Sequence, residues 1–196
     1  AQNEGIASTL CSYHKNFIGG VDSGVLPKAA MSVTTSMICD GNINTFRHME
    51  QKHQVESYVL DIPNTYSPEA ERYVVGQLQE LIELLETKTG QKLDMNELKA
   101  AIQRENESKE YYKAFLKEQK HRYYPNTMTL DLYMLFASHL NIGTRETLDF
   151  FKCLAEDVKT YPEFNGKGIL WVHLMPYYQE TLQQYMNYQE KYYIQA

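Results

Sequence analysis

Two of the three cysteines in this chain lie where an apolar segment gives way to polar residues. Cys39 ends the run SMIC and is followed by Asp-Gly-Asn, and Cys11 begins CSYHK, which also contains His14 and Lys15. A structural cysteine usually lies inside an apolar stretch, whereas segments that leave a strand or helix present reactive and metal-ligating side chains. These residue types at these junctions therefore point to thiol chemistry, either as ligands of a metal group or as reactive thiols.

The spacing of the two cysteines leaves two interpretations open. Cys11 and Cys39 are much farther apart than the C-x-x-C pairs of zinc ribbons and ferredoxin-type clusters. Spacing alone is therefore also consistent with two ordinary, half-buried thiols. Position favours a functional role for Cys39, because it would end a strand of an open parallel sheet, where ligands bind. The helix that begins directly after Cys39 would offer free N–H groups to a thiolate.

Polar residues near the cysteines are candidates for the surroundings of such a site. His14 could supply a proton and Lys15 could contact an anion, although both could equally lie on an ordinary helix surface. The further candidates flank Cys39 in the sequence and are Ser36, Asp40 and Asn42. The third cysteine, Cys153, lies in the helical pattern LDFFKCLAEDV and is predicted to pack in the core.

Composition narrows the class of protein. An odd number of cysteines is not a disulfide framework, which favours a reducing, cytoplasmic location. The net charge of −6, with Lys and Arg scattered among the acids, argues against a nucleic-acid partner. No apolar run approaches the roughly 20 residues of a membrane span. The chain also lacks a glycine-rich phosphate loop, a nucleophile elbow and an H-E-x-x-H motif.

The elements that would position these residues alternate between strand and helix. Residues 29–38 read as a strand, 42–54 as a helix and 55–63 as a second strand stopped by Pro63, a pattern typical of a parallel α/β sheet. Ser67 and Pro68 predict the start of a helix that stops at Gly90, with Leu78 and Leu85 among the residues of its apolar face. Further helices are predicted from a cap at Asp94 to about Lys120, over 128–140 and, after a cap at Thr144, over 145–160. A strand over 167–176, a helix and a strand beginning near 192 follow.

This order predicts a Rossmann-like parallel sheet domain with a helical block and the beginning of a second α/β domain. The expected boundaries are 1–66 for the first part of the α/β domain, 67–164 for the helical block and 165–196 for the start of the second. Because the last strand has hardly begun at Ala196, we expect the chain to be part of a longer protein or to be completed by a partner.

Several of these segments together resemble a known family. They are CSYHKNFIGG, TTSMICDGNINTF, VLDIPNTYSPEAERYVVGQLQELIELLE and ILWVHLMPYYQETLQQYMN. The combination resembles the 2-hydroxyacyl-CoA dehydratase and benzoyl-CoA reductase family, and most of all the D-component subunits of the 2-hydroxyglutaryl-CoA dehydratase type. The most specific parts are CDGN after a strand and DIP followed by S-P-E and a long helix.

The resemblance implies an oxygen-sensitive [4Fe-4S] cluster held by three cysteines, of which Cys11 and Cys39 match the first two. The third would lie outside this chain, in the second α/β domain, so this piece alone is expected to be inactive. It further implies a second, similar subunit, an ATP-dependent activator protein that supplies an electron, and a 2-hydroxyacyl-CoA substrate dehydrated through a ketyl radical. The expected activity is that of a lyase.

Two other functions remain open at this point. A double-cubane relative would reduce small molecules without a CoA substrate. A protein that kept only the fold would bind a CoA thioester or a partner subunit without catalysis. The number of cysteines in the full-length protein separates these alternatives.

Overall fold

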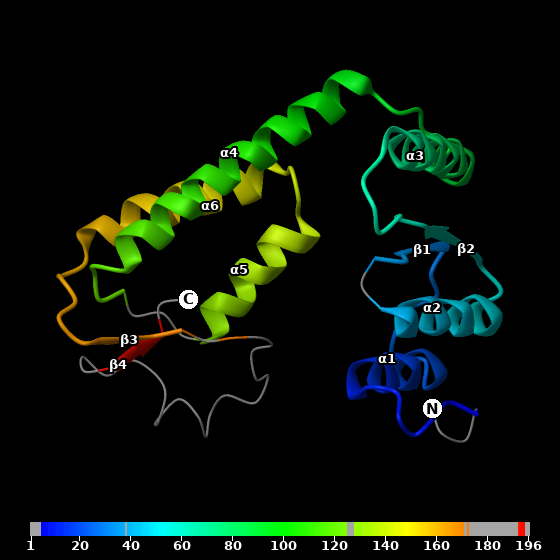
Figure 1. Cartoon of the computed structure of the whole chain (residues 1–196), viewed down its shortest axis with the longest axis horizontal. Coiled ribbons are helices and arrows are strands. Elements are labelled where there is room, and N and C mark those ends of the chain that lie inside the picture. Colours follow the sequence, from blue (N-terminus) through cyan, green and yellow to red (C-terminus); the bar gives the residue numbers. More distant parts are fainter. Residues whose placement is uncertain (1–4, 38, 125–127, 171, 173–191, 195–196) are drawn as a thin grey trace. The chain divides into compact units, whose positions relative to one another are not determined.

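The chain folds into two units, residues 1–93 and 94–196 (Figure 1). The computed structural model describes residues 5–37, 39–124, 128–170, 172 and 192–194. Both units contain parallel strands and helices, which confirms the α/β class. The domain boundaries expected near residues 66 and 164 come from the order of predicted strands and helices in the sequence. They remain predictions.

The N-terminal unit is built around a strand–helix–strand motif. Strands β1 (Met31–Thr35) and β2 (Glu56–Leu60) pair in parallel, with Met31 opposite Glu56 and Thr35 opposite Leu60. Helix α2 (Asp40–His53) connects them. The predicted adjacency of these two strands is therefore confirmed, and the carboxyl end of β1 leads directly to the N-terminus of α2.

Helices cover the strand pair in layers. Helix α2 packs on both strands, α1 (Ser12–Asp22) packs on α2, and α3 (Pro68–Thr89) packs on β2 (Figure 1). Figure 1 shows α2 and α3 on opposite faces of the strands, with α1 beyond α2. The Phe17 ring of α1 stacks on the Phe46 ring of α2 with ring centroids 5.8 Å apart, and Ile18, Val21 and Met49 of the same two helices are buried. This contact holds α1 against α2 within the N-terminal unit.

Helix α3 confirms its predicted ends but corrects its predicted buried face. The Ser67 hydroxyl accepts a hydrogen bond from the Ala70 N–H, and Gly90 ends the helix with a φ of 69°. No residue of α3 is buried, and Leu78 and Leu85 on its apolar face are 42% and 39% exposed. The reason is that α3 packs on a single strand of a two-stranded sheet, which is too narrow to cover the whole helix face.

The C-terminal unit is mostly helical. Its elements are α4 (Met95–Gln119), α5 (Met128–Leu140), α6 (Arg145–Asp157), the 3₁₀ helix η2 (Val158–Thr160), β3 (Lys167–Ile169) and β4 (Tyr192–Ile194). The short strands β3 and β4 pair in parallel. The helix predicted between them lies outside the described residues. The four predicted helices of this chain from residue 68 to 160 are all present, with ends within a few residues of the predicted ones.

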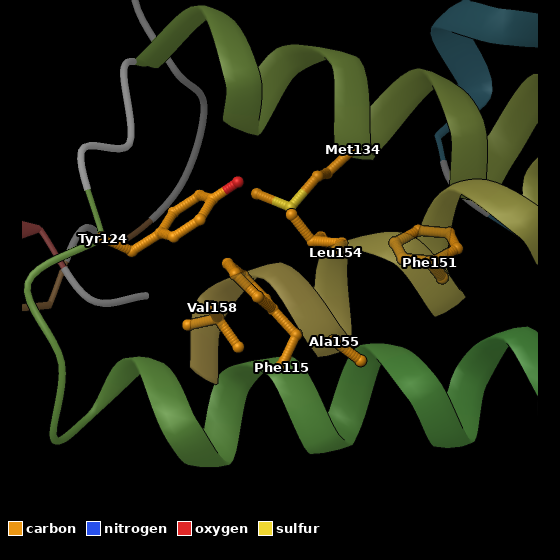
Figure 2. Close-up of a cluster of buried hydrophobic side chains, with 7 residues drawn as sticks. All are labelled: Phe115, Tyr124, Met134, Phe151, Leu154, Ala155 and Val158. Carbon is orange, nitrogen blue, oxygen red and sulfur yellow. The ribbon is translucent and has the colours of Figure 1, made fainter. Parts of the chain in front are cut away.

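A buried apolar cluster joins α4, α5 and α6 (Figure 2). Figure 2 shows Phe115 of α4 and Met134 of α5 pointing toward the side chains of α6. The members of the cluster are Phe115, Tyr124, Met134, Phe151, Leu154, Ala155 and Val158. The helices of this unit therefore share one core.

Cys153 does not belong to this core, which corrects the prediction of a buried thiol. It is exposed on α6 and lines a surface cleft with Tyr124, Phe150 and Thr160. The reason is helical geometry. Successive helix residues turn by about 100°, so Cys153 points away from the face that Phe151 and Leu154 turn toward α4.

Within the part of the chain that the structure describes, none of the helices is both long and apolar enough to span a membrane.

Candidate functional site

The two junction cysteines are the N-cap residues of packed helices. Cys11 caps α1 and Cys39 caps α2, both with extended backbone angles. Neither side chain makes a capping hydrogen bond, and both thiols are exposed and unbridged. Because the N-terminus of a helix carries partial positive charge, both sulfurs lie at helix ends where anionic groups are stabilised.

A buried histidine lies directly beside Cys39. His14 comes from α1, is only 5% exposed, and places Nε2 3.3 Å from the Cys39 Sγ. Its sequence position predicted this proximity, and the packing of α1 on α2 produces it. The site therefore pairs an exposed thiol with an imidazole held in the interior of the unit.

The hydrogen bonds of Thr45 determine which ring nitrogen of His14 carries a hydrogen atom. The buried Thr45 hydroxyl donates its one proton to the Gly41 carbonyl over 2.7 Å, and its oxygen lies 3.0 Å from His14 Nδ1. Since that hydroxyl proton is already used, the Nδ1 contact is a hydrogen bond from the His14 ring N–H to the Thr45 oxygen. Nε2 is the ring nitrogen that faces Cys39.

Gly41 allows this arrangement because it has no side chain. A Cβ at position 41 would lie 2.9 Å from His14 Nε2 and 3.2 Å from the Cys39 Sγ. Sequence reasoning included Gly41 only as part of the helix start and missed Thr45 entirely. A threonine one helical turn after a glycine is the pattern of a hydroxyl bonded back to the helix, but it does not indicate a histidine from another element.

We expect Gly41→Ala to lower the free energy of unfolding by about 1–3 kcal/mol, because the added methyl group overpacks His14 against a fixed Thr45. The matched control is Gly76→Ala in the middle of α3, where a Cβ meets no atom within 4 Å. That control should stabilise the chain by about 0.5–1 kcal/mol, since alanine is the better helix former. Urea unfolding of both variants measures the two changes, and equal effects would contradict the crowding at Gly41.

The other candidates from the sequence include Lys15, Asp40 and Asn42, which lie in the first turns of α1 and α2. The Lys15 amine, half-buried on α1, donates to the Ser8 carbonyl over 3.1 Å. Asp40 and Asn42 lie in the first turn of α2, where the Asn42 N–H donates to the Cys39 carbonyl over 3.0 Å. Their roles toward a ligand remain predictions.

Ser36 links the ends of the two strands. Its hydroxyl donates to the Asp61 carboxylate over 2.7 Å and accepts from the Ile62 N–H over 2.8 Å. The Tyr73 hydroxyl also donates to Asp61, over 3.2 Å, and this hydrogen bond to a carboxylate raises the pKa of Tyr73. The Gln77 side chain of α3 bonds both the N–H and the carbonyl of Asp61 over 2.8 Å. Sequence reasoning missed Asp61, Tyr73 and Gln77. Of these, only Asp61 belongs to a segment that the sequence analysis noted, DIP.

An ion pair also holds α1 against α2. His48 Nε2 donates to the Asp22 carboxylate over 2.8 Å, and the Lys52 amine lies 3.8 Å from the same oxygen. Burial alone would raise the pKa of Asp22, but the hydrogen bond and charge of His48 bring it below its ordinary value of 3.8. A carboxyl with a lowered pKa stabilises the fold above that ordinary value and loses this contribution as the pH falls through the folded value.

We therefore expect Asp22→Asn to lower the free energy of unfolding by about 0.5–1 kcal/mol at pH 7, since the pair is largely but not fully shielded from water. The difference between this variant and the unmodified chain should shrink as the pH falls below 3.8 and disappear only below the lower pKa of Asp22 in the folded chain. Urea unfolding at pH 7 and over a series of lower pH values measures it. Glu110→Gln, which alters a mostly exposed pair with Lys113, is the control and should change little at any of these pH values.

The described residues do not complete a metal site by themselves. Among them, no three histidine, cysteine, aspartate or glutamate side chains lie close enough together to hold a metal ion. They offer the His14–Cys39 pair and, at the N-terminus of the neighbouring helix, Cys11. Any further ligands would come from outside the residues that the structure describes.

Comparison with known proteins agrees with these features. Residues 1–196 match the family described as 2-hydroxyglutaryl-CoA dehydratase, D-component. The chain belongs to this family. A curated relative, the (R)-phenyllactyl-CoA dehydratase alpha subunit of Clostridium sporogenes, is 27% identical over 180 residues, which cover 82% of this chain and 42% of the relative. The chain thus spans less than half the length of that relative, and the family resemblance seen in the sequence is confirmed.

Proposed function

We propose that this chain is part of a subunit of a 2-hydroxyacyl-CoA dehydratase, a lyase that removes water from 2-hydroxyacyl-CoA thioesters by a radical route. Membership of the D-component family over the whole chain supports the reaction class. The name of the relative, an alpha subunit, supports a second subunit as partner. The proposal includes an ATP-dependent activator protein as the electron donor and a cytoplasmic location.

The cofactor proposed for the complete protein is a [4Fe-4S] cluster, with Cys11 and Cys39 as two of its ligands. Cluster irons are bound by cysteine sulfur, and both Cys11 and Cys39 are exposed at helix N-termini. The absence of a Cβ at Gly41 keeps space beside the Cys39 sulfur. When bound, such a cluster supplies the single low-potential electron that radical dehydration requires. The single observation that carries this proposal is the placement of both family-matched cysteines at the N-caps of two packed helices.

Residues of this chain would position Cys39 and shield the proposed cluster site from water. His14 and Thr45 fill the interior behind Cys39, so water reaches the sulfur only from the exposed side. The Ser36–Asp61 hydrogen bond ties the end of β1 to the segment after β2, which stabilises the approach of the chain to Cys39. These contacts leave one open side at the carboxyl end of the strands, where α/β proteins bind ligands.

The test is anaerobic purification of the full-length protein, followed by iron and sulfide analysis and a visible spectrum. Cys11→Ser and Cys39→Ser should each lose most of the bound iron. Cys153→Ser should keep the wild-type iron content, because Cys153 is exposed on α6 in the other unit. Equal iron contents in all three variants would show that the cluster assignment is wrong. Iron for two cubanes would favour a small-molecule reductase instead, and a chain without iron would favour a binding protein.

A further inference from the structure

We propose that the sheet of the N-terminal unit is extended at the free edge of β1, by a parallel strand that the same polypeptide supplies from outside the described residues. The strand order is then β2, β1 and this added strand. The curated relative, of which the match covers 42%, has the length for such a strand. Cys39 follows β1 and faces the opening between β1 and the added strand. The assignment of a ligand to that opening rests on the proposed function.

The faces that α2 and α3 cover determine on which side the sheet continues. A crossover between parallel strands is right-handed in nearly all proteins, so the face on which its helix lies sets the direction of the next strand. Helix α2 leads from β1 to β2 on one face, whereas α3, the next helix after β2, lies on the opposite face (Figure 1). A right-handed crossover on that opposite face runs back past β1. The strand that it reaches therefore joins the free edge of β1.

Side-chain contacts place the two helices on opposite faces as well. Ser57 of β2 forms a hydrogen bond with Ser32 of β1, which is buried on the α2 side of the sheet. The next residue, Tyr58, points to the other face, where its hydroxyl lies 2.8 Å from the Gln77 carbonyl of α3. Val33 shares that face with Tyr58 but is 40% exposed, although it lies in the middle of β1. Helix α3 thus covers β2 and leaves the same face of β1 open within the described part of the chain.

The outer edge of β2 is closed at its carboxyl end. The Leu60 carbonyl accepts from the Ser36 N–H over 3.1 Å, and the Ile62 N–H donates to the Ser36 hydroxyl over 2.8 Å, so both groups point toward β1. Backbone groups alternate in direction along a strand, and those of Asp61 therefore point to the outer edge. There the Gln77 side-chain amide accepts from the Asp61 N–H and donates to the Asp61 carbonyl, both over 2.8 Å. This amide occupies the place that a neighbouring strand would need.

The proposed strand order puts Cys39 at a topological switch point. Ligands of open α/β sheets bind outside the carboxyl ends of the strands, where crossovers leave two adjacent strands in opposite directions. In this unit that point lies beside β1, on the side away from β2. Cys39 is the N-cap of the helix that leaves β1. The loop after the added strand is therefore the segment that completes the site opposite Cys39, whereas Asp61 and Gln77 hold the far side together.

The test compares two proline variants of the full-length protein, Val33→Pro in β1 and Val59→Pro in β2. Both N–H groups point away from the β1–β2 ladder, so the strand pair itself treats the two positions alike. Proline lacks this N–H and is tolerated only where no neighbouring strand accepts from it. We expect Val33→Pro to melt at least about 6 °C below Val33→Ala, and Val59→Pro to melt within about 2 °C of Val59→Ala. The alanine variants account for the loss of each side chain.

Hydrogen exchange in the unmodified full-length protein makes the same comparison without a substitution. The Val33 amide should exchange at least about tenfold more slowly than the Val59 amide, at low and at high protein concentration. Exchange at Val33 that is as fast as at Val59 would overturn the proposal. Protection of Val33 that is lost on dilution would also overturn it, because a second copy would then supply the strand. Neither measurement depends on iron, so an iron-free protein with a protected Val33 would overturn only the cluster.

Discussion

Phe115→Ala is expected to lower the free energy of unfolding by about 3–5 kcal/mol. Phe115 is completely buried at the centre of the cluster in Figure 2. Its ring meets Tyr124 edge to face, with ring centroids 5.4 Å apart. Alanine would remove the apolar contact and leave a cavity between α4 and α6, because helix backbones collapse only partly into such a space. Urea unfolding followed by circular dichroism measures the loss.

The control for Phe115 is Cys153→Ala on α6. Cys153 belongs to a helix of the same core but is exposed, so its replacement should change the free energy of unfolding by no more than about 0.5 kcal/mol. If Phe115→Ala cost no more than this control, the cluster would not be the core of the C-terminal unit.

Gly143→Ala is expected to lower the free energy of unfolding by about 2–4 kcal/mol, from two separate causes. Gly143 lies between α5 and α6 with a φ of 74°, a conformation that costs a residue with a side chain about 1–2 kcal/mol. A Cβ would also lie 2.8 Å from the Ala101 carbonyl oxygen of α4. Because that atom is helix backbone, it cannot move aside, and the Arg104 side chain further holds the Gly143 carbonyl over 2.6 Å. Urea unfolding measures the combined loss.

Gly90→Ala isolates the first cause. Gly90 has a similar φ of 69°, but a Cβ there meets no atom within 4 Å. Its replacement should therefore cost only the backbone strain of about 1–2 kcal/mol. The excess loss in Gly143→Ala reports the contact with α4, and equal losses in the two variants would mean that the loop does not press on that helix.

Local signals in the sequence predicted the ends of most elements. The Ser67 and Thr144 caps, the Asp94 cap and the Gly90 stop all lie where the sequence indicates them. The physical reason is that these signals act within one helical turn, through hydrogen bonds between a side chain and nearby backbone groups. For the same reason the strand–helix–strand motif could be predicted, since a parallel pair joined by a short helix has few alternative arrangements.

Burial was less predictable, because it depends on which neighbour covers a face. The periodicity of α3 predicted an apolar face, but the sheet beneath it is too narrow to bury Leu78 and Leu85. Cys153 lies among apolar residues in the sequence, yet it points away from α4. A one-dimensional pattern identifies an apolar stretch, whereas only the packed unit determines how much of it is covered.

The candidate site also combines features that the sequence indicated with features that only the tertiary structure shows. Residue types and junction positions indicated Cys11 and Cys39 as candidate ligands, which remains a prediction, and included His14 among their possible neighbours. The Nε2–Sγ contact, the protonation of His14 through Thr45 and the need for glycine at position 41 were decided by the tertiary structure alone. Cys39 and Thr45 belong to the α2 segment and His14 to α1, so no local hydrogen bond brings them together. Their geometry depends on the packing of α1 against α2, which the Phe17–Phe46 stack and the Asp22–His48 pair hold together, because that packing brings His14 beside Cys39.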